Sequence, residues 1–139
     1  MISLTIAGAM AMVCILVHTE ALSLVKKFTA RITRFRLSLL VTWLLLLSAH
    51  VLQVWLYALV YWLCDIYGLG GLQGMTEPLD YVYFSAVVYT TLGFGDIVPE
   101  AGVRLLVGSQ ALVGLCLIAW SATATYGHVT AGREQGLWM

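Results

Sequence analysis

Three long apolar runs dominate the sequence, at residues 2–25, 37–64 and 105–130. Each reaches or exceeds the ~20 consecutive apolar residues that a membrane-spanning helix needs. The second and third runs contain no Asp, Glu, Lys or Arg, and only 10% of the chain is charged, against roughly 25% in a typical soluble domain. The sequence therefore predicts a small all-α membrane protein with three transmembrane helices, and it leaves little chain for a soluble domain.

The charged residues predict an orientation for these helices. Five of the seven basic residues and no acid lie in the turn at residues 26–36, whereas five of the seven acids lie between residues 65 and 104. Cytoplasmic loops are the ones enriched in Lys and Arg. We therefore expect a multi-pass protein of a cell membrane, with its N-terminus outside and its C-terminus in the cytoplasm. The compactness of the chain favours the inner membrane of a bacterium.

Several classes of function lack support in the sequence. The formal net charge is zero, so there is no electrostatic footprint for a nucleic-acid partner. The three cysteines stand singly in apolar runs, without the paired spacing of a zinc or redox site. No catalytic triad, phosphate-binding loop or metal cluster is recognisable, so we expect neither an enzyme nor a resident cofactor.

A short apolar stretch at residues 79–89 follows a glycine-rich segment at residues 68–74. Eleven residues of helix are about 16 Å long, roughly half of a membrane span, so this stretch can only dip into the membrane and return. Pro78 suits the first position of such a helix, because the proline lacks an N–H that would be unpaired there. The glycines before it predict a flexible outer turret.

The returning stretch reads Thr-Thr-Leu-Gly-Phe-Gly-Asp at residues 90–96, followed by Ile-Val-Pro. Non-helical backbone at membrane depth must be buried in protein or line a watery path. Gly93 and Gly95, at alternate positions, allow successive carbonyl groups to face one axis, where they can replace the hydration shell of a cation. The carboxyl end of the short helix also favours a cation.

This motif, with a flanking span on each side, resembles the pore signature of tetrameric potassium channels. Three further runs, His-x-Glu-Ala-Leu at 18–22, Ala-His at 49–50 and Trp-Ser-Ala at 120–122, resemble a subgroup of small three-helix bacterial channels. The resemblance to potassium channels covers about two thirds of the chain and implies a re-entrant pore helix and a selectivity filter. The implied K⁺ ligands are the Thr91 hydroxyl and four carbonyls, with Gly95 closing the filter and Asp96 at the outer mouth; the carbonyls are those of Thr91, Leu92, Gly93 and Phe94. The implied organisation is an extra helix and basic loop (1–35), a pore domain (36–130) and a short cytoplasmic tail (131–139).

A potassium filter closes its ring with four such loops, and this chain holds one, so the resemblance implies a homotetramer in the lipid bilayer. Asp80, Asp96 and Glu100 would then ring the mouth and concentrate cations there. Gly114 falls at the hinge position of the last helix, although a close-packing role is equally open, and Gly108 is expected to pack. Family spacing directs a set of side chains toward the inner cavity: Leu115, Ile118, Ala122, Thr123 and Tyr126, the last as a constriction.

The chain departs from the family pattern around the filter. Phe94 replaces the commoner tyrosine, and Val87 stands where some members have a glutamate that pairs with the mouth aspartate. Tyr83 and Phe84 replace two frequent tryptophans. These residues predict largely apolar bracing and a less rigid filter, with altered selectivity or inactivation.

Polar residues inside the spans allow two interpretations. His18 and Glu20 lie in the first run, and His50 and Gln53 lie in the second. Such residues commonly form hydrogen bonds between helices. An intramembrane ionisable group is also a functional hypothesis, and a histidine could act as a pH sensor. Ser121 is similarly open between an ion-facing role and a helix contact.

The sequence thus favours a potassium channel. Within the same class, a cation channel that separates Na⁺ from K⁺ poorly remains an alternative. From another class, so does a non-conducting auxiliary protein with a pore-like fold.

Overall fold

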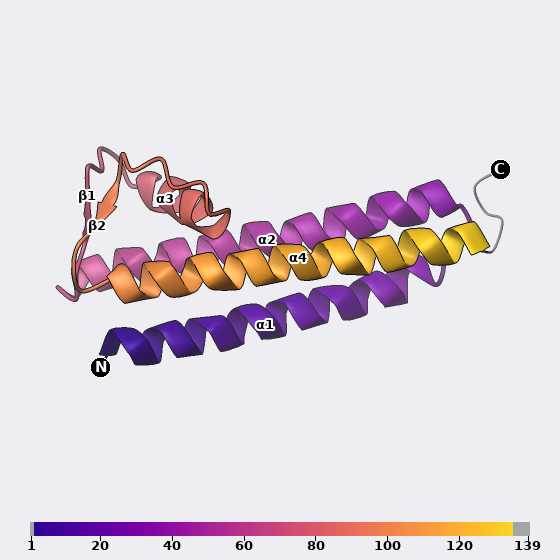
Figure 1. Ribbon diagram of the computed structural model, residues 1–139, viewed down its shortest axis with the longest axis horizontal. Helices are drawn as coiled ribbons and strands as arrows, with labels where there is room; N and C mark the ends of the chain where they lie inside the picture. The colour runs from indigo at the N-terminus through magenta and orange to yellow at the C-terminus, as the bar shows by residue number, and fades with distance from the viewer. Residues whose placement is uncertain (1, 135–139) are drawn as a thin grey trace.

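The computed structural model describes residues 2–134, in which three long helices lie side by side (Figure 1). They are α1 (Ile2–Thr29), α2 (Phe35–Ile66) and α4 (Arg104–Glu134). All three are long and apolar enough to cross a membrane, so the chain is a multi-pass membrane protein. Each helix runs a few residues beyond its predicted apolar run. Helix α4 extends into the segment predicted as a tail, and residues 135–139 of that segment lie outside the described residues.

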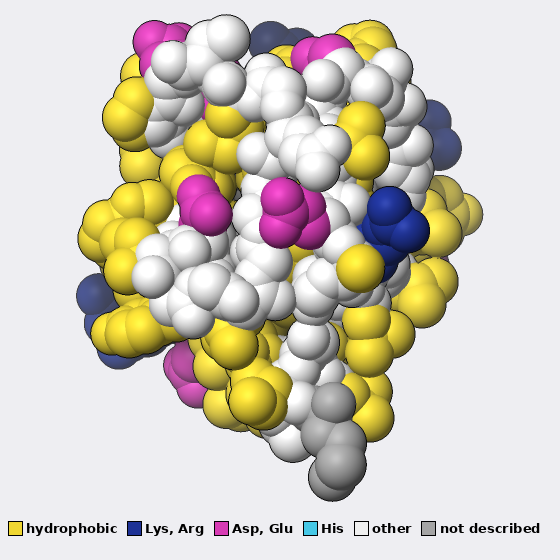
Figure 2. Space-filling model, turned by 90° about the vertical axis from the view of Figure 1, so that its left-hand side faces the viewer, with side chains coloured by type: hydrophobic (Ala, Val, Ile, Leu, Met, Phe, Trp, Pro, Cys, Tyr) yellow, Lys and Arg dark blue, Asp and Glu magenta, His cyan; other side chains and the backbone are white. Residues whose placement is uncertain are grey.

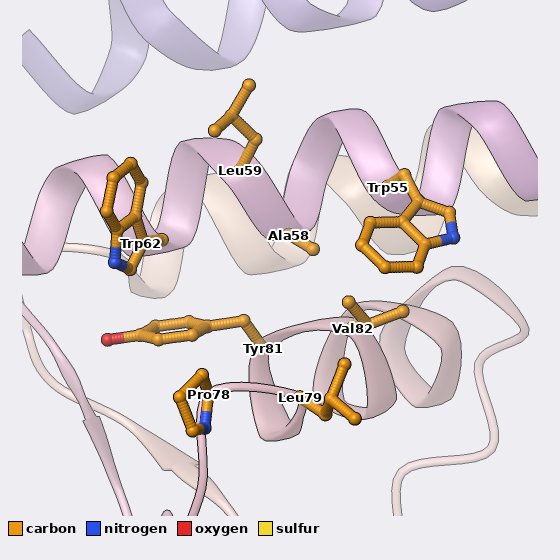
Figure 3. A pocket seen from close by; sticks show the side chains of 8 residues that line it. All are labelled: Trp55, Ala58, Leu59, Trp62, Pro78, Leu79, Tyr81 and Val82. Atoms are coloured by element: carbon orange, nitrogen blue, oxygen red, sulfur yellow. The ribbon is translucent and has the colours of Figure 1, made fainter.

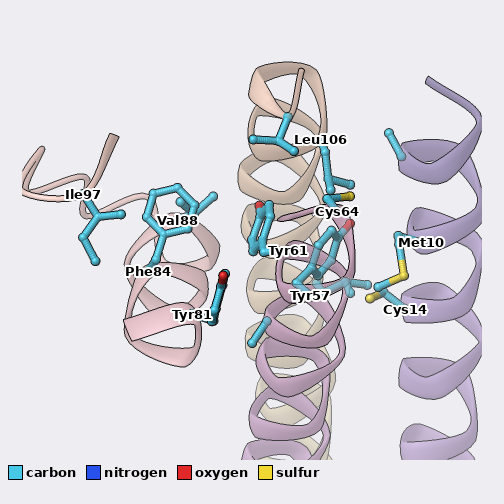
Figure 4. Packing of buried hydrophobic residues seen from close by; sticks show 14 residues of the cluster. Met10, Cys14, Tyr57, Tyr61, Cys64, Tyr81, Phe84, Val88, Ile97 and Leu106 are labelled. Atoms are coloured by element: carbon cyan, nitrogen blue, oxygen red, sulfur yellow. The ribbon is translucent and has the colours of Figure 1, made fainter. Parts of the chain in front are cut away.

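Helix α1 packs against both α2 and α4 of its own chain. Its buried residues recur every three or four positions and so form one face, consisting of Ala7, Met10, Cys14, His18, Ala21 and Val25. Figure 4 shows Met10 and Cys14 on this face directed toward Tyr57 of α2. Small residues on the face allow the helices to approach closely, as is common in membranes.

A short helix, α3 (Asp80–Tyr89), follows α2 in the chain and lies beside it at one end of the bundle (Figure 1). The prediction that Pro78 is the first helical residue is wrong. Pro78 lies in a turn closed by a hydrogen bond of 3.0 Å from the Asp80 N–H to the Glu77 carbonyl. The Asp80 carboxylate accepts the backbone N–H groups of Thr76 at 2.6 Å and Glu77 at 3.0 Å, which fixes this turn ahead of the helix.

The glycine-rich segment is paired, in contrast to the flexible turret that was expected. Strand β1 (Leu72–Gln73) pairs antiparallel with β2 (Val98–Pro99), which follows the predicted filter. The segment also packs closely on the chain before α4, since a Cβ atom on Gly102 would lie 1.9 Å from the Leu69 carbonyl oxygen. The glycines therefore permit close backbone contact.

The two ends of the bundle differ in charge. The start of α1, helix α3 and both strands lie at one end, and the α1–α2 turn with its basic residues lies near the other (Figure 1). Figure 2 views the first end and shows acidic side chains across its face, with hydrophobic side chains at the flanks. The structure thus places the acid-rich segment and the basic turn at opposite ends of the spans.

Candidate functional site

The candidate site begins where α3 ends. The Leu92 N–H donates to the Val87 carbonyl, and the Thr91 N–H donates to the Val88 carbonyl, each at 2.9 Å. This pair of bonds is a Schellman motif, which ends a helix with one residue in the left-handed conformation. That residue is normally glycine, but here it is Thr91, with φ of 59°. A β-branched residue in this region is a genuine outlier and marks stored backbone strain.

The chain after Thr91 has an alternating backbone. Positive φ angles occur at Thr91 (59°), Gly93 (58°) and Gly95 (80°), so every second residue is left-handed. Leu92 and Phe94, which alternate with these left-handed residues, are 59% and 64% exposed. The backbone from Thr91 to Gly95 is thus uncovered and lies outside β1 and β2; we refer to it as the exposed strand. Its alternating handedness suits carbonyl groups that face a common axis.

The Tyr83 side chain joins α3 to the end of this strand. Its hydroxyl donates a hydrogen bond of 2.6 Å to the Asp96 carboxylate. This bond lowers the pKa of Asp96 below its usual range and raises the pKa of Tyr83. The expectation of largely apolar bracing is therefore wrong at this point, because Tyr83 supplies a polar brace through a hydroxyl that a tryptophan in its place would lack.

This geometry agrees with a comparison of the sequence with protein families. Residues 40–131, about two thirds of the chain, match the family model described as "Ion channel". The chain belongs to this ion channel family. No curated protein and no solved structure matches it. The match includes α3, the strand and most of α2 and α4, whereas α1 lies outside it.

The other acids predicted at the mouth of the channel hold the loops together. The Asp80 carboxylate is used by the turn before α3, and its hydrogen bonds to Thr76 and Glu77 lower its pKa. A Glu100 carboxylate oxygen accepts the Gly71 N–H at 3.0 Å. Asp65, which the sequence did not single out, accepts the Tyr81 hydroxyl. Asp96 is the acid next to the strand, and its side chain is exposed.

Helix α3 is fastened to its neighbours by polar side chains that the sequence analysis missed. The Gln110 amide of α4 donates to the Ser85 hydroxyl at 2.8 Å and to its carbonyl at 3.1 Å. The Ser85 hydroxyl donates to the Val54 carbonyl of α2 at 2.7 Å, and the Tyr61 hydroxyl donates to Gln110 at 2.5 Å. The signal available in the sequence was Gln110, an amide side chain within an uncharged apolar run.

Gly114 contacts the last residue of α3. A Cβ atom on Gly114 would lie 2.2 Å from the Tyr89 carbonyl oxygen and 3.0 Å from its ring. The structure thus gives Gly114 a close-packing role within the chain. The expectation that Gly108 packs is not met among the described residues, since a Cβ atom there would meet nothing within 4 Å.

The polar residues of the spans gather at the same level as Tyr89. His18, His50, Gln53, Ser121 and Tyr89 form one hydrogen-bonded group that links all four helices. The interpretation as contacts between helices is confirmed for both histidines and for Gln53, and Ser121 is a helix contact as well. Glu20 is exposed on α1 and takes no part in this group.

One face of α4 is uncovered in the single chain. Leu115 and Tyr126 expose 55% and 70% of their side chains, and Ile118 exposes 39%. Ala122 and Thr123 are exposed as well, although the Thr123 hydroxyl donates to the Ala119 carbonyl of its own helix at 3.0 Å. All five residues predicted for the inner cavity are thus free to meet an axis or another subunit.

The hollow that lies beside the start of α3 is lined by apolar side chains. This hollow, shown in Figure 3 and about 350 Å³ in volume, is an apolar groove between α2 and the start of α3; it is lined by Trp55, Ala58, Leu59, Trp62, Pro78, Leu79, Tyr81 and Val82. Within residues 2–134, no group of three or more His, Cys, Asp or Glu side chains could hold a metal ion.

Proposed function

We propose that this ion channel conducts K⁺ passively through a filter formed by residues 91–95 of four identical subunits. The observation that carries the proposal is the alternation of left-handed residues at Thr91, Gly93 and Gly95 along an exposed strand. Rings of backbone carbonyls replace the hydration shell of K⁺ in such filters. The ligands are the Thr91 hydroxyl and the carbonyls of Thr91, Leu92, Gly93 and Phe94. The permeant K⁺ is the substrate, and no cofactor is required.

The single chain supports a tetramer in two ways. It supplies one filter strand, whereas a closed ring needs four. It also leaves the strand and one face of α4 uncovered, which is where neighbouring subunits and the ion path would lie. Helix α3, pointing its carboxyl end toward the strand, would favour a cation below the filter through its backbone dipole.

The topology that we propose places α3, β1, β2 and the exposed strand of residues 91–95 on the outer face of a cell membrane. Cytoplasmic loops are enriched in Lys and Arg, and the basic α1–α2 turn lies at the opposite end from α3. The N-terminus is then outside and the C-terminus is in the cytoplasm. Asp96 faces the outer entrance, and Tyr126 on α4 lies toward the inner one.

The test is a flux measurement on the purified protein in liposomes. Uptake of ⁸⁶Rb⁺ against a sodium gradient, blocked by Ba²⁺, supports a potassium channel. Equal flux of Na⁺ contradicts the selectivity and supports a weakly selective cation channel. A tetramer without flux contradicts conduction and supports an auxiliary protein. Gly93→Ala is the matched negative control, because alanine is strained at a φ of 58°.

A further inference from the structure

With both histidines neutral, the hydrogen-bonded group in the membrane spans has one consistent arrangement of protons, and the orientation of the Gln53 amide determines it. The Gln53 side-chain nitrogen lies 3.1 Å from the Cys14 carbonyl oxygen, and its oxygen lies 2.5 Å from the Tyr89 hydroxyl. The opposite orientation of the amide would place two acceptors against each other at Cys14. Gln53 therefore donates to Cys14 and accepts the proton of Tyr89.

The direction of the next two bonds follows. Tyr89 has a single hydroxyl proton, which Gln53 takes, so toward His50 Nδ1 at 2.7 Å its oxygen can only accept. His50 must then carry a proton on Nδ1, which in a neutral ring leaves Nε2 unprotonated. The hydroxyl of Ser121, 2.9 Å from Nε2, donates to it.

The series of hydrogen bonds ends at His18. Because Ser121 gives its proton to His50, its oxygen accepts from Nε2–H of His18 at 3.3 Å. The remaining nitrogen, His18 Nδ1, is buried and has no hydrogen-bond partner among residues 2–134. Each group in the series is thus defined as a donor or an acceptor, and the series ends at the unpaired lone pair of His18 Nδ1.

Both histidines are neutral in this arrangement. The titratable groups that face them are each other, with ring centroids 5.3 Å apart, and Tyr89 from α3. From α4 the facing groups are Trp120 and Ser121, neither of which is titratable near neutral pH. Glu20, the only acid on α1, is exposed. A charged imidazole without a facing carboxylate is costly in an apolar interior.

We propose that this series of hydrogen bonds positions the filter through Tyr89. His50 and Gln53 are the positioning residues that contact Tyr89 directly. Ser121 and His18 act on Tyr89 through His50. Tyr89 is the last residue of α3 and stands two positions before the strained Thr91. Its backbone carbonyl and the base of its ring pack on Gly114, and its hydroxyl is held by His50 and Gln53 of α2, so both the backbone and the side-chain end of Tyr89 are fixed. Helix α1, outside the family match, thereby contributes to filter geometry. The effect on conduction rests on the proposed function.

The proton order is tested without any flux. ¹⁵N NMR of histidine-labelled protein in lipid, at neutral pH, reports which ring nitrogen of each histidine carries the proton. We expect His50 protonated on Nδ1, His18 protonated on Nε2, and both neutral. The signals are assigned by their loss in His50→Asn and His18→Gln. An Nε2–H tautomer or a charged ring at His50 overturns the proton order.

The effect on the filter is tested by the Rb⁺-to-Na⁺ permeability ratio and the decay of the current. Tyr89→Phe removes both hydrogen bonds of the Tyr89 hydroxyl, to Gln53 and from His50. It is expected to change the ratio or the decay by at least about fivefold, the size of one lost hydrogen bond. The matched control is Tyr57→Phe, since the buried Tyr57 hydroxyl has no hydrogen bond of acceptable geometry in the described chain. Equal behaviour of the two variants, with both tetramers intact, overturns the positioning role.

Two pairs of variants separate this role from a general loss of structure. Asparagine at position 50 keeps an N–H in the place of Nδ1, so His50→Asn should retain wild-type selectivity while His50→Phe should resemble Tyr89→Phe. Adding His50→Phe to Tyr89→Phe should change little beyond Tyr89→Phe alone, because the single variant already lacks the bond between the two residues. Additive effects overturn the proposal. If the wild-type protein shows no flux, the proposed function fails, while the NMR result still decides the proton order.

Discussion

The Tyr83 hydroxyl and the Asp96 carboxylate are 2.6 Å apart and connect helix α3 directly to the end of the predicted filter. The bond stabilises the ionised form of Asp96 and so lowers the pKa of that carboxyl. Asp96 thus keeps its negative charge to lower pH than an ordinary aspartate. If it faces the outer entrance, that charge attracts cations where they enter.

Removing this donor should make the channel more sensitive to external acid. In Tyr83→Phe the pKa of Asp96 rises toward its usual value, so the carboxylate is neutralised at higher pH and the inward current falls earlier. The measurement is current against external pH, and the midpoint should move to higher pH. Tyr67→Phe, which alters an exposed tyrosine at the same end of the chain, is the control. An unchanged midpoint in Tyr83→Phe would contradict a role for this bond in conduction.

Substitution of Gly114 should disturb the end of α3. In Gly114→Ala the new Cβ atom would lie 2.2 Å from the Tyr89 carbonyl oxygen, so backbone has to move. Overpacking of this kind costs about 1–3 kcal/mol. We expect a lower free energy of unfolding and a reduced Rb⁺ flux. The measurements are thermal unfolding of the tetramer in detergent and liposome uptake.

The matched control for this change is Gly108→Ala on the same helix. A Cβ atom there meets nothing within 4 Å in the chain, and alanine favours a helix over glycine by roughly 1 kcal/mol. The control should therefore be neutral or stabilising. Equal destabilisation by both substitutions would show that Gly114 has no special contact with Tyr89, or that Gly108 packs against another subunit.

The left-handed conformation of Thr91 predicts an unusual order of stability. A left-handed non-glycine residue costs about 1–2 kcal/mol, so Thr91→Gly should unfold less readily than Thr91→Ala. Both variants lose the hydroxyl, and both should lose the part of the stabilisation by K⁺ that depends on it. Thermal unfolding in KCl and in NaCl measures the two effects separately.

The neighbouring Thr90 provides the control for Thr91. It has a φ of −84°, where glycine gains nothing, so Thr90→Gly should be less stable than Thr90→Ala. The opposite signs at adjacent positions identify backbone strain as the cause. Alanine more stable than glycine at both positions would contradict a left-handed Thr91.

The spans, and the left-handed backbone at Gly93 and Gly95, could be predicted from the sequence because their signals are local. Hydropathy identifies a span within about 20 residues, and the alternate glycines lie within one short segment. The left-handed Thr91 could not be predicted in this way, because the residue expected in that conformation is glycine.

The partners of the polar side chains depend instead on how the helices pack. His50 and Ser121 are 71 residues apart in the chain, and Tyr89 and Gln53 are 36 apart. Gln53 and both histidines were recognisable as polar residues in apolar runs. Tyr89 was hidden among the aromatic residues before the motif, and its role follows only from the register of α3 against α2.

The absence of a tyrosine at position 94 provides a final prediction about selectivity. Phe94 exposes 64% of its side chain in the chain and has no hydroxyl with which to brace the strand. Phe94→Tyr should add such a donor, raise the Rb⁺-to-Na⁺ permeability ratio and slow the decay of the current, by roughly the fivefold that one hydrogen bond supplies. Phe94→Leu, which removes the ring without adding a hydroxyl, should change neither quantity in that direction. If Phe94→Tyr leaves both the ratio and the decay at their wild-type values, the filter is already as rigid as the commoner tyrosine would make it, and the Tyr83–Asp96 bond is sufficient to brace it.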